Sequence, residues 1–344
     1  MFNDKTVLIT GGTGSFGKKM VEAILQEYKP RRLIVFSRDE LKQFEMSQRW
    51  STSKYPCIRY FIGDVRDKER LLRAFDGVDY VIHAAALKQV PAAEYNPSEA
   101  IKTNVLGAMN IIEAALTANV KKVVALSTDK ACNPINLYGA TKLCSDKLFT
   151  AANVYRGSKE TIFAVVRYGN VVGSRGSVIP FFLERSKTGV LPITDPQMTR
   201  FWITIEQGVR FVLNVFEIAR GGEIFVPKIP SMKITDLASA VAPECRQEVV
   251  GIRPGEKIHE LLISRDDARH TWEFDHSYVI AQPHAAASPA LSYPNVQKCA
   301  EDFEYNSGTN PWMMSVVELR SIVAQVAHDI AEGQIRWSMD EVPK

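Results

Sequence analysis

Reactive side chains follow one short apolar run, residues 123–126, which is typical of a buried strand. The next residues, 127–136, are polar and include a proline, and from Leu137 onward apolar residues return at helical spacing. Within this stretch lie the candidate catalytic residues Thr128, Asp129, Lys130, Tyr138 and Lys142. We therefore expect the end of a strand to deliver acid and base groups to an active site.

Tyr138 and Lys142 stand four residues apart, so on a helix they share one face, roughly 6 Å apart along the axis. A phenol with a pKa of about 10 is a poor base at neutral pH, but a neighbouring ammonium stabilises the phenolate and lowers that pKa. Such a pair can take a proton from a substrate hydroxyl while a hydride leaves the carbon behind it. The spacing alone also fits a pair on a helix surface. A glycine-rich nucleotide loop in the same chain favours the catalytic interpretation.

That loop follows the apolar strand pattern of residues 6–10 and precedes a helical pattern over residues 18–28. Glycines let the backbone turn tightly and approach a pyrophosphate, whose charge is favoured at a helix N-terminus. A glycine triplet by itself is often only a flexible turn, but a strand before it and a helix after it predict dinucleotide binding. The expected contacts with the cofactor here are Gly11, Thr13, Gly14, Ser15, Phe16 and Gly17.

The second expected strand, residues 32–36, indicates which dinucleotide binds. It is followed by Ser37, Arg38, Asp39, Glu40, Leu41 and Lys42, which we expect to contact the cofactor. A carboxylate at this strand end suits the ribose hydroxyls of NAD, whereas an arginine suits the 2′-phosphate of NADP. Arg38 therefore favours NADP. Asp39 comes directly after it, so a solvated loop pair remains an alternative.

The third and fourth expected strands, residues 58–62 and 78–82, supply further cofactor contacts. Asp64 and Val65 follow the third strand, although Asp64 fits a turn-forming aspartate equally well. Ligands collect at the carboxyl ends of the strands of open parallel sheets. The remaining residues expected at the cofactor are Ala84, Lys88, Thr103 and Val171, with Tyr138 and Lys142 at its reactive end. His83, inside an apolar strand, reads as a core histidine with its hydrogen bonds satisfied.

The alternation of strand and helix patterns predicts an α/β fold, a Rossmann-type doubly wound parallel sheet with a smaller C-terminal substrate lobe. We expect residues 1–170 to form the NADP-binding domain, to which some later segments return. Residues 171–344 then form mainly the substrate-binding lobe and a terminal helix over 315–331. A long helix is expected from Asn96–Pro97 to Ala118. Little can be assigned between His270 and Asn306.

Polar residues scattered through the second half suggest a site for a diphosphate, because guanidinium groups match phosphate oxygens. Each arginine taken singly also fits a surface residue. The candidate substrate-binding residues are Lys88, Asn170, Arg175, Thr194, Arg200, Arg253 and Glu256.

The composition excludes several classes of protein. A chain of 344 residues with 46% apolar content can bury a substantial core. Its net charge of +3, without a long run of like charges, predicts no nucleic-acid partner. Five cysteines without Cys-x-x-Cys spacing indicate neither a disulfide framework nor a metal site and predict reduced thiols in the cytoplasm. No signal-peptide pattern and no apolar run near the ~18 residues of a membrane span occur, so we expect no membrane partner.

With these motifs in hand, the chain resembles the extended short-chain dehydrogenase/reductases, and among them the inverting UDP-N-acetylglucosamine 4,6-dehydratases that begin pseudaminic acid synthesis. The resemblance extends over most of residues 1–280. It rests on residues 11–17, 37–42, 128–130, 138–142, 167–176 and 253–257. Retaining dehydratases of this fold carry Asp-Glu after the threonine, and simple 4-epimerases lack the acid and base pair. Here the pair is Asp129-Lys130.

The resemblance implies a lyase with a tightly held NADP that is regenerated in each turnover. Tyr138, helped by Lys142 and Thr128, would take the proton of the 4-hydroxyl as the hydride passes to NADP⁺. Lys130 would remove the hydrogen on carbon 5, and Asp129, kept protonated, would donate to the departing 6-hydroxyl. Reprotonation of carbon 5 from the opposite face would invert it. For this work Lys130 needs a depressed pKa, either from burial or from Lys88.

Other interpretations remain open at this point. The enzyme could be a retaining dehydratase or a 4-epimerase acting on another UDP-sugar, and Asp129-Lys130 could be only an ion pair in a loop. A non-catalytic NADP-binding regulator would be expected to lack part of Thr128, Tyr138 and Lys142, all of which are present. The resemblance also implies a UDP-sugar substrate and a homo-oligomer, either a dimer or a hexamer.

Overall fold

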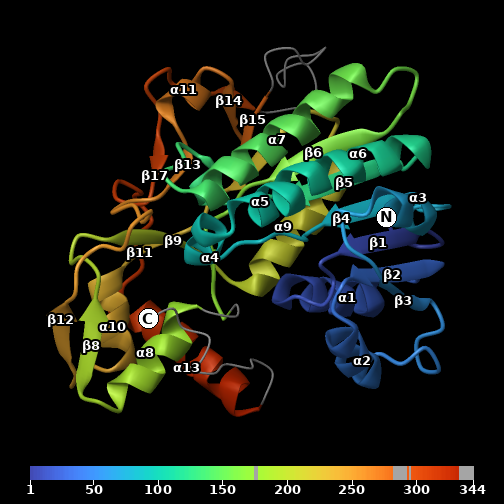
Figure 1. Ribbon diagram of the computed structural model, residues 1–344. Coiled ribbons are helices and arrows are strands. Elements are labelled where there is room, and N and C mark those ends of the chain that lie inside the picture. Colours follow the sequence, from blue (N-terminus) through green and yellow to red (C-terminus); the bar gives the residue numbers. More distant parts are fainter. Residues whose placement is uncertain (174–176, 282–292, 294–295, 333–344) are drawn as a thin grey trace.

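Strands and helices alternate along the first half of the chain in the computed structural model, which describes residues 1–173, 177–281, 293 and 296–332 (Figure 1). The strands of this half are β1 (Thr6–Thr10), β2 (Arg32–Ser37), β3 (Ile58–Ile62), β4 (Tyr80–His83), β5 (Lys122–Leu126), β6 (Ile162–Val166) and β7 (Asn170–Val171). The helices are α1 (Ser15–Glu27), α2 (Glu40–Arg49), α3 (Lys68–Ala74), α4 (Val90–Tyr95), α5 (Pro97–Ile101), α6 (Gly107–Thr117) and α7 (Leu137–Tyr155). Two short turns join them, the π-helical η1 (Lys102–Leu106) and the 3₁₀-helical η2 (Asp129–Ala131).

The second half has shorter elements. Its helices are α8 (Val178–Ser186), α9 (Ile205–Ile218), α10 (Ile234–Val241), α11 (Arg265–Ala268) and α13 (Val316–Ala331). Its strands are β8 (Val190–Ile193), β9 (Thr199–Ile203), β10 (Ile224–Pro227), β11 (Ser231–Lys233), β12 (Arg246–Val249), β13 (Leu261–Ile263), β14 (Thr271–Glu273), β15 (Ser277–Ile280), β16 (Gln297–Lys298) and β17 (Tyr305–Asn306).

In the described part of the chain, ten strands form the main sheet in the order β16-β14-β15-β10-β6-β5-β4-β1-β2-β3. The strands from β3 to β10 in this order pair in parallel, whereas β15, β14 and β16 extend the sheet antiparallel. Helices α3, α6 and α7 pack on one face, and α1 and α9 lie together on the other (Figure 1). The α/β class and the doubly wound parallel sheet are therefore confirmed. Because the strand order reverses between β1 and β4, a crevice for ligands opens at their carboxyl ends.

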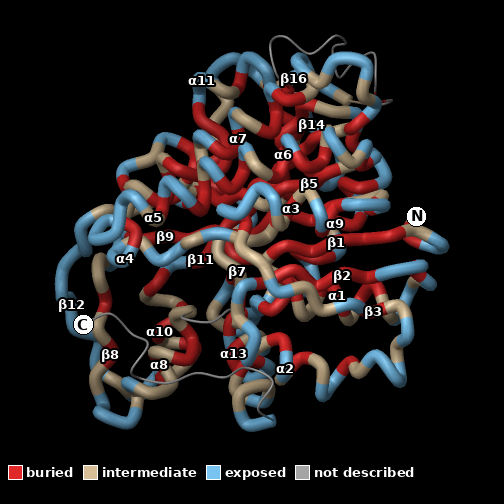
Figure 2. The backbone as a smooth tube through the Cα atoms, turned by 45° about the vertical axis from the view of Figure 1, so that its right-hand side comes forward, coloured by how far each residue is buried: buried red, intermediate tan, exposed pale blue. Residues whose placement is uncertain are grey.

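The core lies along the central strands of this sheet, which are buried on both faces (Figure 2). Every residue of β1 is buried, and β2 is buried from Leu33 onward. Continuous apolar runs with β-branched side chains, such as Val7-Leu8-Ile9, form such strands because helices cover both faces of a parallel sheet. This rigid sheet holds the strand ends that carry the candidate site.

A second hydrophobic core lies in the smaller lobe, where α8, α10 and α13 pack together beside the parallel pair β8 and β12. Its buried members include Phe182, Leu191, Trp202, Leu237 and Leu319. The terminal helix α13 begins after Ser315, whose hydroxyl and Glu318 form a capping box. Strands β10, β14, β15 and β16 nevertheless join the main sheet, although they lie beyond residue 170. The domain boundary itself stays a prediction.

The long helix expected from Asn96 to Ala118 is divided in the structure. The helix α5 passes through the π-helical turn η1 into α6. In this turn Thr103 and Asn104 are buried, and Asn104 bonds to the backbone of Leu87 through both its amide atoms, at 2.9 Å each. We infer that the wider turn brings these polar side chains against the loop after β4, which apolar periodicity alone does not predict.

Among the described residues, no helix combines the length and the apolar character that a membrane crossing requires.

His83 is the core histidine that the sequence predicts. It is 2% exposed, and its Nδ1 lies 2.8 Å from the hydroxyl of Thr10. Burial, and then the charge of Lys142, lower the pKa of His83 to about 3 from its ordinary 6.5. The imidazole is therefore neutral in the folded protein at neutral pH.

We expect the neutral His83 to make folding sensitive to acid. Below pH 6.5 the unfolded chain binds a proton at His83 that the folded chain does not, so its stabilising contribution is lost as the pH falls from about 6.5 toward 3. The expected slope is up to about 1.4 kcal/mol per pH unit. Urea titrations between pH 7 and pH 4 should show this slope, and His83→Gln should remove it. The exposed His270→Gln is the control, and an equal slope in all three proteins would contradict the prediction.

Candidate active site

The turn between β1 and α1 forms a cradle at the open edge of the sheet. Gly11 has a φ of 64°, and a Cβ there would lie 2.8 Å from the backbone nitrogen of Ala85. A Cβ at Gly17 would lie 2.5 Å from Gly12, so α1 can begin here only with glycine. Gly14 precedes the first turn of α1, and Ser15, Phe16 and Gly17 after it line the cavity. This geometry fits a pyrophosphate at a helix N-terminus.

A cavity of about 1740 Å³ extends from this cradle into the smaller lobe. A site for one small ligand usually measures about 300–1,000 Å³, so this cavity can hold a dinucleotide and a nucleotide sugar together. Most of the residues predicted from the sequence line it, namely Gly11, Thr13, Gly14, Ser15, Phe16, Gly17, Ser37, Arg38, Asp39, Leu41, Lys42, Asp64, Val65, Ala84, Lys88, Thr103, Thr128, Lys130, Tyr138, Lys142, Asn170, Val171, Thr194, Arg200, Arg253 and Glu256. Glu40, which is exposed on α2, and Asp129, which is fully buried, do not line the cavity. Arg175 lies outside the described residues.

The end of β2 presents polar side chains to this cavity. The carboxylate of Asp39 accepts a hydrogen bond from the backbone nitrogen of Lys42 at 2.9 Å and caps α2, and it lies 2.6 Å from the Lys42 ammonium. The hydroxyl of Ser37 lies 2.8 Å from that of Thr13. The guanidinium of Arg38 is 57% exposed and 3.7 Å from Asp64. Asp39 is thus engaged in capping, whereas Arg38 extends at the rim of the cavity.

The end of β5 carries the candidate acid and base. The hydroxyl of Thr128 donates to Asp129 Oδ1 at 2.9 Å, and Asp129 is fully buried. The ammonium of Lys130 lies 3.1 Å from the same oxygen, 3.3 Å from Glu260 Oε1 and 3.4 Å from Asn170 Oδ1. Asp129-Lys130 is therefore an ion pair, as the alternative interpretation held, in which Asp129 is buried and the partly buried Lys130 lines the cavity.

Tyr138 and Lys142 are both buried on one face of α7, so they are not a surface pair. Asn136 caps this helix by accepting from the backbone nitrogen of Gly139 at 2.8 Å. A Cβ at Gly139 would lie 2.1 Å from the carbonyl oxygen of Lys130, so glycine is required for α7 to approach η2. The hydroxyl of Tyr138 bonds to Thr128. This bond connects Tyr138 on α7 with the loop after β5 that carries Asp129 and Lys130.

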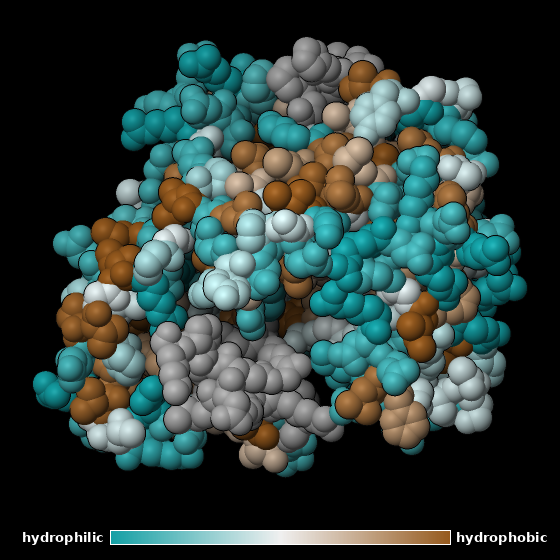
Figure 3. Space-filling model, in the orientation of Figure 1, coloured by the Kyte–Doolittle hydropathy of each residue, from teal (hydrophilic) through white to brown (hydrophobic). Residues whose placement is uncertain are grey.

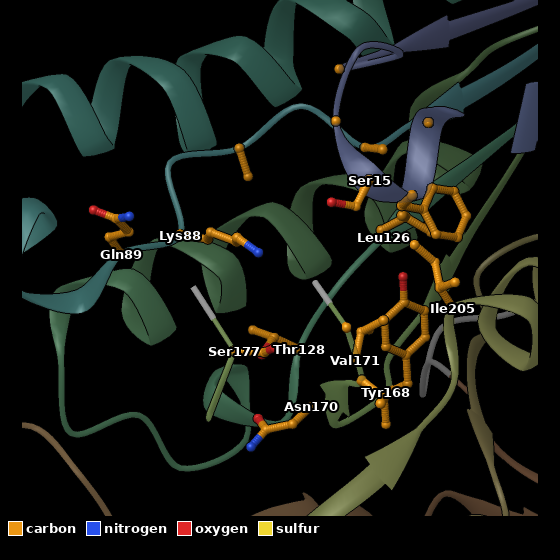
Figure 4. A pocket seen from close by; sticks show the side chains of 18 of the residues that line it. Ser15, Lys88, Gln89, Leu126, Thr128, Tyr168, Asn170, Val171, Ser177 and Ile205 are labelled. Carbon is orange, nitrogen blue, oxygen red and sulfur yellow. The ribbon is translucent and has the colours of Figure 1, made fainter. Parts of the chain in front are cut away.

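The loop of residues 253–257 lies against this catalytic region. The Lys257 ammonium donates to the carbonyl of Cys132 at 2.6 Å, and the Asn136 amide donates to the carbonyl of Gly255 at 2.8 Å. Arg253 and Glu256 of the same loop line the cavity. In Figure 4, Lys88, Thr128, Asn170 and Val171 surround one space, with Ser15 of the cradle beyond it. Side chains from distant parts of the sequence thus meet in one site.

Comparisons with known proteins place this site in a family. A family model described as polysaccharide biosynthesis protein matches residues 7–282. The UDP-N-acetylglucosamine 4,6-dehydratase (inverting) of Campylobacter jejuni subsp. jejuni serotype O:2 is 57% identical over 338 residues, covering 94% of this chain and 98% of the relative. The chain belongs to the family of inverting UDP-N-acetylglucosamine 4,6-dehydratases.

Two further known proteins are similar to this chain. The X-ray structure of Pen from Bacillus thuringiensis superposes with a TM-score of 0.86 at 39% identity, covering 94% of this chain and 98% of that one. The UDP-glucose 4-epimerase of Rickettsia prowazekii is 47% identical, covering 78% of this chain and 80% of the relative.

The pKa values of Tyr138 and Lys142 do not all shift in the direction that the sequence predicts. Burial raises the pKa of Tyr138 to about 12, although the Lys130 charge and the Thr128 bond lower it. Burial lowers the pKa of Lys142, and Asp146 opposes this. The expectation that Lys142 depresses the pKa of the phenol is therefore wrong, because burial of the phenol outweighs the nearby charges.

The expected depression of the pKa of Lys130 is wrong as well. Burial would lower this pKa, but the carboxylates of Asp129 and Glu260 outweigh burial and raise it above the ordinary value. From the sequence, we expect the charge of Lys88 to lower the pKa of Lys130. Instead, burial and the charge of Lys130 lower the pKa of Lys88.

Sequence reasoning missed several residues of this dehydratase site. Glu260 contacts Lys130, and Tyr168 and Trp202 line the same cavity. No spacing rule points to Glu260, because it lies far from Lys130 in the sequence. Its only signal is an acid within the polar stretch that begins at Arg253. Arg200 lines the cavity, and its Nη1 donates to the backbone carbonyls of Thr199 and Ile258, so its role as a diphosphate ligand stays a prediction.

Proposed function

We propose that this protein catalyses the NADP-dependent 4,6-dehydration of UDP-N-acetylglucosamine with inversion at carbon 5. The product would be UDP-2-acetamido-2,6-dideoxy-β-L-arabino-hex-4-ulose, and the reaction would open pseudaminic acid synthesis. The observation that carries the proposal is the ion pair between the buried Asp129 and the partly buried Lys130, in a chain 57% identical to the C. jejuni enzyme of this activity.

The residues of the cradle and of the β2 end fit a dinucleotide, with α1 at the pyrophosphate and Arg38 at the ribose end. A dinucleotide held by these residues would supply the hydride chemistry, the removal of hydride from carbon 4 and its return at carbon 6. Tyr138 takes the proton of the 4-hydroxyl as this hydride leaves, and Thr128 holds that hydroxyl. The Lys130 charge and Thr128 favour the phenolate form of Tyr138, against the effect of its burial.

The acid and base pair Asp129 and Lys130 acts once carbon 4 is a ketone, because the ketone acidifies the hydrogen on carbon 5. The amine of Lys130 removes that hydrogen as a proton, and Asp129 protonates the 6-hydroxyl, which leaves as water. In the overall balance the proton of the 4-hydroxyl leaves with that water. The hydrogen-bonded series Tyr138, Thr128 and Asp129 connects the group that receives this proton with the group that delivers it.

The function is tested by incubating the purified protein with UDP-N-acetylglucosamine in heavy water, without added NADPH, and recording proton NMR spectra. We expect a 4-keto-6-deoxy sugar of L configuration with deuterium at carbon 5. A D-configured keto sugar would identify a retaining dehydratase. No turnover with any UDP-sugar would favour the non-catalytic regulator.

A 4-epimerase is the second candidate, since the R. prowazekii relative of that name is 47% identical. An epimerase uses Tyr138 and Lys142 but needs no acid and base for carbons 5 and 6. In the same NMR experiment it would give a 4-epimer that keeps its 6-hydroxyl and takes no deuterium at carbon 5.

The choice of NADP is supported by Arg38, whose guanidinium stands at the end of β2 while Asp39 caps α2. We expect Arg38→Ala to weaken NADP⁺ binding about 10- to 100-fold, the worth of a charged hydrogen bond to phosphate, and to leave NAD⁺ binding nearly unchanged. Isothermal titration calorimetry with both cofactors measures this. Arg31→Ala is the matched control, because Arg31 pairs with Asp79 beside the opposite end of the sheet. Equal losses for both cofactors would contradict the choice.

We further propose a homo-oligomer, a dimer or a hexamer, in the cytoplasm. Hydrophobic side chains gather over α5 to α7 on one face (Figure 3). They include the exposed Ile101, Leu106 and Met109. Apolar surface of this kind commonly marks a protein interface. The five free cysteines suit a reducing compartment.

A further inference from the structure

Glu260 is held rigidly at the wall of the cavity, one residue before β13. It is 2% exposed. Its backbone nitrogen donates to the hydroxyl of Ser307 at 2.9 Å, and its carbonyl accepts from the nitrogen of Ser307 at 2.9 Å. Ser307 is itself fully buried and lies 2.7 Å from the hydroxyl of Thr199 in β9. The position of this glutamate is therefore fixed by three separate segments of the chain.

The carboxylate of Glu260 is only half satisfied. Its Oε1 lies 3.3 Å from the Lys130 ammonium and 3.8 Å from Nε of Arg200. Its Oε2 is buried and has no hydrogen-bond partner among the described residues. A buried carboxylate oxygen without a partner is costly and uncommon. The other oxygen of Glu260, Oε1, faces Lys130, and both residues line the cavity, so this geometry indicates a role in the site.

The surroundings of Lys130 show what that role is. The ammonium of Lys130 donates hydrogen bonds to Asp129 and Asn170. The carboxylate of Glu260 lies 3.3 Å from this ammonium as an ion-pair partner. A neutral amine has two N–H groups and a lone pair. When the proton shared with Asp129 has moved to that carboxyl, Asn170 can hold one of the two remaining N–H groups and the charge of Glu260 attracts the other. The lone pair of the amine then has a fixed direction.

We propose that Glu260 is a positioning residue for Lys130, which orients the amine and stabilises the ammonium that forms when Lys130 takes the proton of carbon 5. This inference rests on the proposed dehydratase function. The guanidinium of Arg200 stands beside Glu260, with Nε 3.8 Å from Oε1.

The proton balance of the elimination agrees with this role. The lone pair of Lys130 takes the proton of carbon 5, and the electrons of that C–H bond form the double bond between carbons 5 and 6. The bond between carbon 6 and its oxygen breaks, and the proton of Asp129 completes the leaving water. Lys130 ends as an ammonium and Asp129 as a carboxylate. Glu260 therefore makes Lys130 a stronger base, since its charge favours the product of the proton transfer.

The pH dependence follows from the charged and titratable groups around Lys130. These are Asp129 on η2, Glu260 before β13, Arg200 on β9, Lys88 after β4 and Tyr138 on α7. The alkaline limb of the rate profile reports the loss of the proton that Lys130 holds. Removing the charge of Glu260 leaves the cations Arg200 and Lys88 without its compensation. The alkaline limb should then move to lower pH.

Glu260→Gln tests the proposal, because it keeps the shape of the side chain and removes its charge. We expect kcat to fall about 10- to 100-fold. The alkaline limb should move down by about one to two pH units, as expected for the loss of one charge at this distance. The deuterium isotope effect with substrate labelled at carbon 5 should increase, because the elimination becomes slower than the other steps. Glu260→Asp, which restores the charge, should recover part of kcat and return the limb toward its original position.

The matched control is Glu223→Gln, since Glu223 is also buried but binds the backbone nitrogens of Arg220 and Gly221 away from the cavity. It should lower the melting temperature without moving the pH profile or the isotope effect. If Glu260→Gln behaves in the same way, Glu260 is only structural and the inference is overturned. If the unaltered protein forms no keto sugar, the proposed function fails instead, and the two failures are distinguishable.

Discussion

Replacing Lys130 with methionine is expected to lower kcat for the keto sugar about 1,000-fold, within the range for loss of a general base. Methionine fills a similar volume but cannot accept the proton of carbon 5. Oxidation at carbon 4 depends on Tyr138 and should continue. The variant should therefore show absorbance of the reduced nicotinamide after substrate is added, without release of the 6-hydroxyl and without deuterium entering carbon 5. Single-turnover absorbance and NMR measurements check the two halves separately.

The stability of this variant needs its own control. Removing the ammonium leaves the buried carboxylates of Asp129 and Glu260 facing the gap that it filled, which destabilises the fold. Lys122→Met is the matched replacement, because the half-buried Lys122 donates to the carbonyls of Phe216 at 2.7 Å and Ala219 at 2.8 Å outside the cavity. It should lose stability and keep its turnover per folded molecule. An unchanged kcat in Lys130→Met would remove Lys130 from the mechanism.

The architecture around β1 could be predicted because its signals are local. A continuous apolar run, a glycine turn and a helix follow one another within residues 6–28, and the structure places β1 and α1 there. The strands β14 and β15 could not be predicted from the same kind of signal. They have three and four residues, such as Thr271–Glu273, and pair antiparallel beside β10. Their pairing depends on a sheet edge built from distant sequence.

The candidate site likewise has residues that local sequence signals predict and residues that they do not. Thr128, Lys130, Tyr138 and Lys142 follow from spacing and chemistry within one strand, loop and helix. Glu260 approaches Lys130 only after the smaller lobe packs on the sheet, and no local pattern announces that contact. The pKa directions depend on such contacts and on burial, so the sequence indicates which groups titrate but not in which direction they shift.

Replacing Tyr138 with phenylalanine is expected to lower turnover about 1,000-fold and to remove every later step with it. The ketone at carbon 4 must exist before carbon 5 becomes acidic, so without the phenol neither elimination nor deuterium exchange at carbon 5 can occur. Tyr60→Phe is the matched control, because burial also raises the pKa of Tyr60 to about 12, while its hydroxyl only donates to the carbonyl of Trp50 at 2.8 Å. It should keep its turnover.

The raised pKa of Tyr138 gives this prediction a pH signature. Burial moves the pKa to about 12, so the phenolate is a minor form near pH 7, and its fraction rises about tenfold per pH unit below that value. When oxidation at carbon 4 limits the rate, log kcat should therefore rise with pH in the unaltered protein and be flat in Tyr138→Phe. Comparison with Lys130→Met then orders the two proton transfers. Loss of Tyr138 should abolish both the formation of reduced nicotinamide and the deuterium exchange at carbon 5. Loss of Lys130 should abolish the deuterium exchange alone. If Tyr138→Phe still incorporates deuterium at carbon 5, deprotonation does not require the ketone and the proposed sequence of steps is wrong.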